Sequence, residues 1–197
     1  LLLAHYENDA FNFAKKCVPC QKHGNAIHAP AVILHSLTTP QPFETWAFDL
    51  IGLIHPLSKG CIWILVGTKC FTKWVEAVLL KKATGPTVAN FIKEHIICHF
   101  GIPKRILSDN GTPFVNPHVR QLLASYSIDH VKSTPYYLKG NGQAEATNKT
   151  LLKVLSRMVH DNHKEWHDKL PMALWAYRTS KRTPTQATPF SLVYGAK

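Results

Sequence analysis

The sequence predicts a mixed α/β domain in which a sheet is flanked by helices. Three short runs of β-branched and aromatic residues come first along the chain, and strand patterns then alternate with helical patterns. That order is typical of a mixed sheet covered by helices. Hydrophobic residues make up 45% of the 197 residues and charged residues 18%, so we expect a folded core of ordinary size.

Five segments are expected to form strands. Most are rich in β-branched and aromatic residues, and Gly, Pro or Ser residues separate the first three, which we expect to be neighbours. The predicted strands are residues 45–51, 61–68, 74–80, 104–108 and 129–133.

Four segments are expected to form helices. Apolar residues recur at the helical period in residues 84–100, and Gly101 and Pro103 then supply a stop. The other predicted helices are residues 117–127, 144–160 and 165–179, the last with a kink at Pro171.

The charge balance favours a polyanionic partner. Lys and Arg number 23 against 12 Asp and Glu, which gives a formal net charge of +11. Nucleic acid is the commonest partner of so basic a chain, although a basic protein without such a partner stays an alternative.

The cysteines and the chain start point to an intracellular protein. The count of five is odd, and Cys61, Cys70 and Cys98 lie in apolar stretches, which favours free thiols in a reducing compartment. No apolar run reaches the roughly 20 residues that span a bilayer, and we expect neither a signal peptide nor a membrane partner. Because the chain has no initiator Met, we expect it to be part of a longer protein.

Two aspartates lie inside or directly after predicted strands, where their carboxylates could take part in catalysis. Asp49 lies inside an apolar strand, where an ionised carboxylate needs a counter-charge, hydrogen bonds or a metal. The alternative is a satisfied core Asp or a strand-end cap. Asp109 directly follows a predicted strand; Asp-Asn-Gly is usually a plain turn, but ligand sites also gather at strand ends in open α/β sheets.

Glu145 opens a predicted helix after Gly140 and Gly142. At about 100° per residue, one acidic-then-basic stripe is formed by Glu145, Lys149, Lys153 and Arg157. The opposite, core-facing stripe is formed by Leu151, Val154, Leu155 and Met158. The polar stripe suits a metal and a phosphate backbone, and a solvated face with charge pairing is the alternative.

Three gathered carboxylates would suit phosphodiester chemistry. In-line displacement at phosphorus is promoted by two divalent ions roughly 3.5–4 Å apart, which activate the attacking oxygen and stabilise the leaving one. Mg²⁺ takes a few carboxylates together with water and substrate phosphate. We therefore expect Asp49, Asp109 and Glu145 to bind two Mg²⁺ or Mn²⁺ ions.

Short motifs along nearly the whole chain carry a family resemblance. They are residues 15–21, 48–52, 71–77, 100–103, 108–112, 140–146, 174–179 and 188–195. With these motifs, and with thirty-five residues between Asp109 and Glu145, the chain resembles the integrase of gypsy-type LTR retrotransposons, part of their Pol polyprotein and related to retroviral integrases.

The resemblance implies an RNase H-like fold with a five-stranded mixed sheet. It implies a catalytic triad of Asp49 on the first strand, Asp109 after the fourth and Glu145 on a later helix. The implied activity is processing of the 3′ ends of element DNA, followed by strand transfer into target DNA. The implied partners are double-stranded DNA and further copies of the chain, in the nucleus. The resemblance further implies that DNA contact or support of the site involves Asn141, Gln143, Asn148 and Lys149, and the helical stripe adds Lys153 as an expected contact.

The resemblance also divides the chain. Residues 1–30 match part of an N-terminal His/Cys zinc module, 31–45 form a linker, 46–160 the catalytic core, and 161–197 a helical extension. Cys17 and Cys20 provide half a zinc site, and structural zinc needs four ligands. We therefore expect Zn²⁺ only if the matching His pair lies upstream, and an improvised site completed by His23 or His28 is the alternative.

Some residues depart from the family pattern. Lys69 stands where the family usually has Asp, and Leu138-Lys139 stand where it usually has a Pro-Gln pair. These departures keep open an alternative function, a catalytically impaired DNA-binding or assembly domain derived from such an element. A nuclease acting on RNA–DNA hybrids shares the fold and metal chemistry but fits the motifs around Asp109 and Glu145 poorly.

Overall fold

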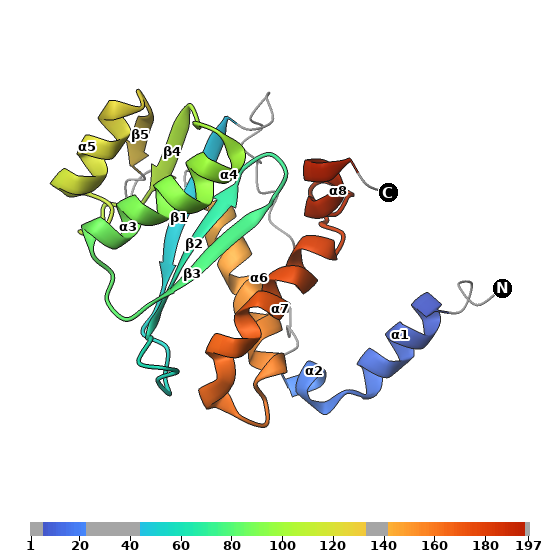
Figure 1. The fold of residues 1–197 in the computed structure, drawn as a ribbon. Helices are drawn as coiled ribbons and strands as arrows, with labels where there is room; N and C mark the ends of the chain where they lie inside the picture. Colours follow the sequence, from blue (N-terminus) through green and yellow to red (C-terminus); the bar gives the residue numbers. More distant parts are fainter. Residues whose placement is uncertain (1–5, 23–43, 133–141, 196–197) are drawn as a thin grey trace.

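The computed structural model of the chain describes residues 6–22, 44–132 and 142–195. A five-stranded mixed sheet lies at its centre, with helices on both faces (Figure 1), which confirms the predicted fold class. Its strands are β1 (Thr45–Ile51), β2 (Trp63–Lys69), β3 (Val75–Leu80), β4 (Arg105–Ser108) and β5 (Asp129–Lys132).

The strands lie in the order β3-β2-β1-β4-β5, so β1 occupies the middle of the sheet. β1 pairs antiparallel with β2, and β2 pairs antiparallel with β3. β4 runs parallel to both β1 and β5. Ala47 of β1 pairs with Leu107 of β4, so the chain that leaves β4 lies beside the second half of β1.

Two groups of helices cover the sheet. One face carries α3 (Gly85–Phe91), the π-helix η1 (Ile92–Ile97), α4 (Cys98–Phe100) and α5 (Pro117–Ser125); the other carries α6 (Gly142–Met158) and α7 (Trp166–Thr179) (Figure 1). The 3₁₀ helix η3 (His163–Glu165) precedes α7, and α8 (Pro189–Tyr194) follows it. Near the N-terminus lie α1 (Tyr6–Lys16) and α2 (Val18–Lys22). No described helix combines the length and apolarity that a membrane crossing requires.

Side chains of β1 alternate between the two faces, as the period of a strand requires. Trp46 and Phe48 are buried in the apolar cluster that includes residues of α3, η1 and α5. Ile51 belongs to the cluster formed with α6 and α7, and Ala47 packs with Ala144 of α6. Asp49 has the parity of Ala47 and Ile51, and it therefore faces α6.

The helical segment predicted at 84–100 forms, but its middle is π-helical. Ile92 and Ile96 remain buried in this π segment, and Gly101 ends the segment at a φ of 82°, a conformation that favours glycine. A helix that the sequence reading missed is α8. Its caps were visible in the sequence, because the Thr188 hydroxyl oxygen accepts from Ser191 N–H and Gly195 adopts a left-handed C-cap.

One prediction about α6 is wrong. Met158 was expected on the core-facing stripe, but it is 37% exposed, because it is the last residue of the helix. Leu151 and Leu155 are buried, as expected.

Candidate active site

Asp49 is held by two hydrogen bonds on the α6 face of the sheet. Leu50 N–H donates to Asp49 Oδ1 (2.9 Å), and Asn148 Nδ2 donates to Asp49 Oδ2 (2.8 Å). Burial is the main reason that the pKa of Asp49 rises to about 6, and the negative charges of Asp109 and Glu145 raise it further. The two hydrogen bonds act in the opposite direction, because they stabilise the ionised form.

Asp109 is placed by the parallel pairing of β1 and β4. Ala47 pairs with Leu107, and Asp49 and Asp109 each lie two residues further on, so the two carboxylates lie at nearly the same level of adjacent chains. Asp109 is exposed, and its Oδ1 accepts from Gly111 N–H at 2.9 Å. A Cβ at position 111 would lie 2.9 Å from that oxygen, so a larger residue there would force the Asp109 side chain to shift.

Glu145 comes to the site through the packing of α6. Ala144 is fully buried against a small cluster that includes Ala47 and Leu107, which belong to the two strands that carry or precede the aspartates. The next residue, Glu145, is exposed on the first turn of the helix. Its charge reaches Asp49, because it contributes to the raised pKa of that carboxyl group.

The negative charges of Asp109 and Glu145 act on Asp49, and the chemistry of the three carboxylates suits a hard divalent cation. Carboxylate oxygens are the ligands that Mg²⁺ prefers, and mutual repulsion among three anions favours a cation between them. Asn148 Oδ1, also beside Asp49, is buried without a hydrogen-bond partner among the described residues. Within residues 6–22, 44–132 and 142–195, however, no three His, Cys, Asp or Glu side chains are grouped closely enough to hold a metal.

Asn148 supports Asp49 and is not positioned as a DNA contact. Its side chain is 7% exposed and bonded to the carboxylate, so of the two roles expected for it, DNA contact or support of the site, the structure favours support. A carboxylate only accepts hydrogen bonds, and this fixes Nδ2 of the amide as the atom facing Asp49.

The structure describes some of the other predicted site residues, and others lie outside its described part. Lys149 is exposed, whereas Lys153 and Arg157 are partly buried. Asn141 lies outside the described residues, as does the side chain of Gln143. Of the half zinc site, Cys17 is a partly buried free thiol, and the side chain of Cys20 lies outside the described part.

Lys69, the departure from the family pattern, is buried away from the three carboxylates. It pairs with Trp46 across β1 and β2, and its Nζ lies 5.6 Å from the Trp46 ring centroid and 5.0 Å from that of Phe100. Burial lowers the pKa of Lys69 to about 8. Leu138 and Lys139 lie outside the described residues.

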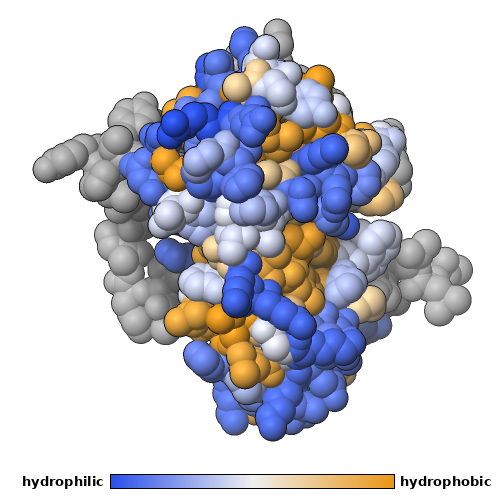
Figure 2. Space-filling view, turned by 60° about the vertical axis from the view of Figure 1, so that its left-hand side comes forward, coloured by the Kyte–Doolittle hydropathy of each residue, from blue (hydrophilic) through white to orange (hydrophobic). Residues whose placement is uncertain are grey.

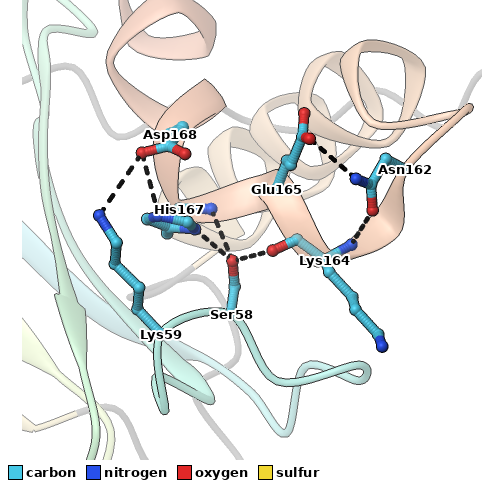
Figure 3. Close-up of polar contacts among 7 residues, drawn as sticks. All are labelled: Ser58, Lys59, Asn162, Lys164, Glu165, His167 and Asp168. Carbon is cyan, nitrogen blue, oxygen red and sulfur yellow. Dashed lines mark hydrogen bonds and ion pairs between the residues drawn. The ribbon is translucent and has the colours of Figure 1, made fainter.

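A Ser-His-Asp arrangement that the sequence reading did not detect lies at the start of α7 (Figure 3). His167 Nδ1 is 2.5 Å from Ser58 Oγ, and His167 Nε2 is 3.0 Å from Asp168 Oδ1. Ser58 is only 1% exposed, and its hydroxyl donates to the Lys164 carbonyl oxygen. A serine nucleophile must be accessible and must give its proton to the histidine, so this arrangement is a structural clamp between the loop after β1 and α7.

Comparison with known proteins identifies the family to which the chain is similar. Residues 39–137 match the family model described as "Integrase core domain". The chain is 29% identical over 191 residues to the Gag-Pol polyprotein of avian reticuloendotheliosis virus, covering 95% of this chain and 16% of the polyprotein. It is 27% identical over 184 residues to the transposon Tf2-3 polyprotein of Schizosaccharomyces pombe, covering 92% of this chain and 14% of that protein.

A solved structure extends the likeness to three dimensions. A chain of the simian T-cell lymphotropic virus intasome in complex with PP2A regulatory subunit B56 gamma matches with a TM-score of 0.71 at 26% identity. The match covers 96% of this chain and 67% of the other. It confirms the RNase H-like fold that the sequence resemblance implied.

Proposed function

Because the chain belongs to the integrase core domain family, we propose that it is the catalytic core of an integrase that processes and transfers retroelement DNA. The family consists of polynucleotidyl transferases that normally use divalent metal ions. The chain spans about one-sixth of the polyproteins that it matches, and the proposal concerns the reaction of this core.

One observation carries the proposal: at one edge of the α6 face, the charges of Asp109 and Glu145, from two distant segments, act on the Asp49 carboxyl group. The pKa of Asp49 is raised partly by Asp109 and Glu145, although Asp49 and Asp109 are 60 positions apart in the sequence. Parallel pairing of β1 and β4 accounts for Asp109, and packing of α6 accounts for Glu145. An accumulation of negative charge in a basic protein indicates a site for cations and not a site of direct contact with DNA phosphates.

Each residue then has a role that follows from its surroundings. Asp49, Asp109 and Glu145 would hold two Mg²⁺ or Mn²⁺ ions, which when bound activate an attacking oxygen and stabilise the leaving oxygen at phosphorus. Asn148 and the Leu50 N–H orient the Asp49 carboxylate, and Gly111 N–H orients Asp109. Lys149 is exposed one turn beyond Glu145, where its ammonium would contact the DNA backbone.

Several finer features belong to the same proposal. The substrate is double-stranded DNA, comprising element ends and target, and the chain acts as a homo-oligomer in the nucleus. The solved relative is a viral intasome, which supports DNA binding and assembly. The element is of the gypsy type, as the sequence motifs suggest.

A strand-joining assay tests the proposal. The purified chain is incubated with branched DNA and Mn²⁺, alongside Asp109→Asn and the matched control Asp161→Asn, which changes an exposed aspartate outside the site. We expect wild type and Asp161→Asn to cut and rejoin the substrate and Asp109→Asn to lose at least about 100-fold in rate, the scale of a group that stabilises the transition state. Equal activity in all three would refute the role of Asp109.

The same assay separates the alternative function. If all three proteins bind the branched DNA and none cuts it, catalysis is refuted and the chain is a DNA-binding or assembly domain. A parallel reaction with an RNA–DNA hybrid tests the alternative hypothesis of a nuclease that acts on such hybrids. That hypothesis requires cleavage of the RNA strand.

A further inference from the structure

We propose that a cavity between α5 and β5 is a subsite for one unpaired nucleotide of the DNA substrate. This inference rests on the proposed function and names a part of its substrate. The cavity has a volume of about 200 Å³. The six lining residues that matter here are Phe114, Arg120, Leu123, Ile128, His130 and Lys132.

The lining has two chemically different parts. Phe114, Leu123 and Ile128 are buried and form an apolar floor, while Arg120 and Lys132 are exposed at the rim. No acidic side chain lines the cavity as the structure describes it. Figure 2, which brings the α5 side of the molecule forward, shows that hydrophilic residues (blue) and apolar residues (orange) are mixed on this face of the molecule.

The combination of an apolar floor and a cationic rim matches a nucleotide better than it matches a free phosphate or a purely apolar ligand. A free phosphate would use the cationic rim but not the apolar floor, and an apolar ligand would leave the two cations without a partner. A nucleotide places its base on apolar or aromatic surface and its phosphate beside Lys or Arg.

The volume limits the enclosed part of the ligand to a single base, whose sugar and phosphate would stay at the rim. Pockets for drug-sized ligands measure roughly 300–1,000 Å³, and this cavity is smaller. A base pair is far too wide for it, so a base must leave the duplex, or lie at a single-stranded end, before it can enter.

A hydrogen-bond chain joins the cavity wall to Asp109. The Ser108 hydroxyl donates to the Asp109 carbonyl oxygen (2.9 Å), and since it has only one proton, it must accept from His130 Nε2 at 2.8 Å. Nδ1 of His130 is then the remaining acceptor of the ring. Burial, together with the charge of Lys132, lowers the pKa of His130 and favours this neutral form. A ligand in the cavity is therefore coupled to the backbone of a candidate catalytic residue.

Binding of two matched DNA probes tests the subsite. Fluorescence anisotropy compares a labelled blunt duplex with the same duplex carrying one unpaired nucleotide at its end. We expect wild type to prefer the second probe by about tenfold, within the range of a stacked base. Ala124→Phe, at an exposed alanine of the cavity lining, should remove the preference, whereas Ala10→Phe, at an exposed alanine of α1, should retain it.

Charge variants and a competitor complete the test. Arg120→Ala and Lys132→Ala should reduce the preference, and Lys93→Ala, which removes an exposed lysine of η1, should not. Free deoxynucleoside monophosphate that abolishes the preference supports recognition of the nucleotide itself. Equal binding of the two probes by wild type, or a preference that survives in Ala124→Phe, overturns the subsite.

The outcome is independent of the strand-joining assay. Equal probe binding together with metal-dependent cutting overturns the subsite and leaves the proposed function intact. A retained preference without any cutting supports the subsite and overturns the catalytic proposal.

Discussion

Protonation of Asp49 should compete with binding of a divalent cation. Because the pKa of this carboxyl group is about 6, about nine-tenths of it is ionised at pH 7 and about one-tenth at pH 5. A cation needs the ionised form, so its apparent affinity should fall about tenfold between these two pH values.

The loss of cation affinity at pH 5 is measurable as a smaller thermal stabilisation of the protein by the cation. A cation at about ten times its dissociation constant at pH 7 stabilises the fold by about 1.4 kcal/mol, and a tenfold weaker affinity leaves about 0.4 kcal/mol. For a chain of this size each kcal/mol raises Tm by about 2–4 °C. We therefore expect Mn²⁺ to raise Tm by about 3–6 °C at pH 7 and by about 1 °C at pH 5.

Differential scanning fluorimetry with and without Mn²⁺ at each pH measures this effect. The paired design is needed because the pH also acts on the protein alone: a carboxyl pKa raised from 3.8 to about 6 means that the folded state binds more protons, so stability falls as pH rises from about 4 to 6. Asp49→Asn should lose the Mn²⁺ effect at every pH, and Asp161→Asn should keep it. An equal shift at pH 5 and pH 7, or an undiminished shift in Asp49→Asn, would refute the reasoning.

Four further predictions concern single residues. Asn148→Ala should raise the pKa of Asp49 further, as measured by NMR titration, because the amide stabilises the ionised carboxylate. Ser58→Ala should destabilise the fold by about 1–3 kcal/mol in urea unfolding, since it breaks the buried clamp; the exposed Ser125→Ala is the control. Lys69→Met should remove the rise in stability that we expect for wild type in urea unfolding between about pH 8 and pH 10.5, because burial lowers the pKa of Lys69 from 10.5 to about 8 and the folded state therefore loses this proton first. Lys149→Ala should flatten the salt dependence of DNA affinity by about one phosphate contact, and an unchanged slope would exclude this residue from the DNA surface.

The face that Asp49 occupies was predictable from the sequence, but its neighbours were not. Alternation along 46–51 separates Trp46 and Phe48 from Asp49, and this depends only on the geometry of a strand. The level of Asp109 depends on the register of a parallel pair whose strands are about sixty residues apart, and no local pattern specifies that register. The motif spacing supplied this information through resemblance alone.

The role of Asn148 shows the same limit. Helical periodicity places Asn148 one turn after Glu145. Whether its side chain contacts DNA or donates a hydrogen bond to Asp49 depends on how closely α6 packs on β1. Ala144 and Ala47 are small and fully buried, which allows that close approach. The Ser58 clamp could not be predicted from local sequence patterns either, because the partners of Ser58 are more than a hundred residues away.

Each aspartate of the site has hydrogen-bond donors of its own, and this affects how it can bind a cation. Asp49 accepts from Leu50 N–H and Asn148, and Asp109 accepts from Gly111 N–H. These donors stabilise the two ionised carboxylates without a cation. A cation must therefore compete for the carboxylate oxygens with the donors, and at Asp49 also with a proton. These neutral donors offset only part of the combined effect of burial and charge repulsion, since the pKa of Asp49 stays raised despite two of them. Protein ligands alone are therefore expected to hold a cation weakly, and the phosphate oxygens of bound DNA would supply the ligands and the charge that complete the site.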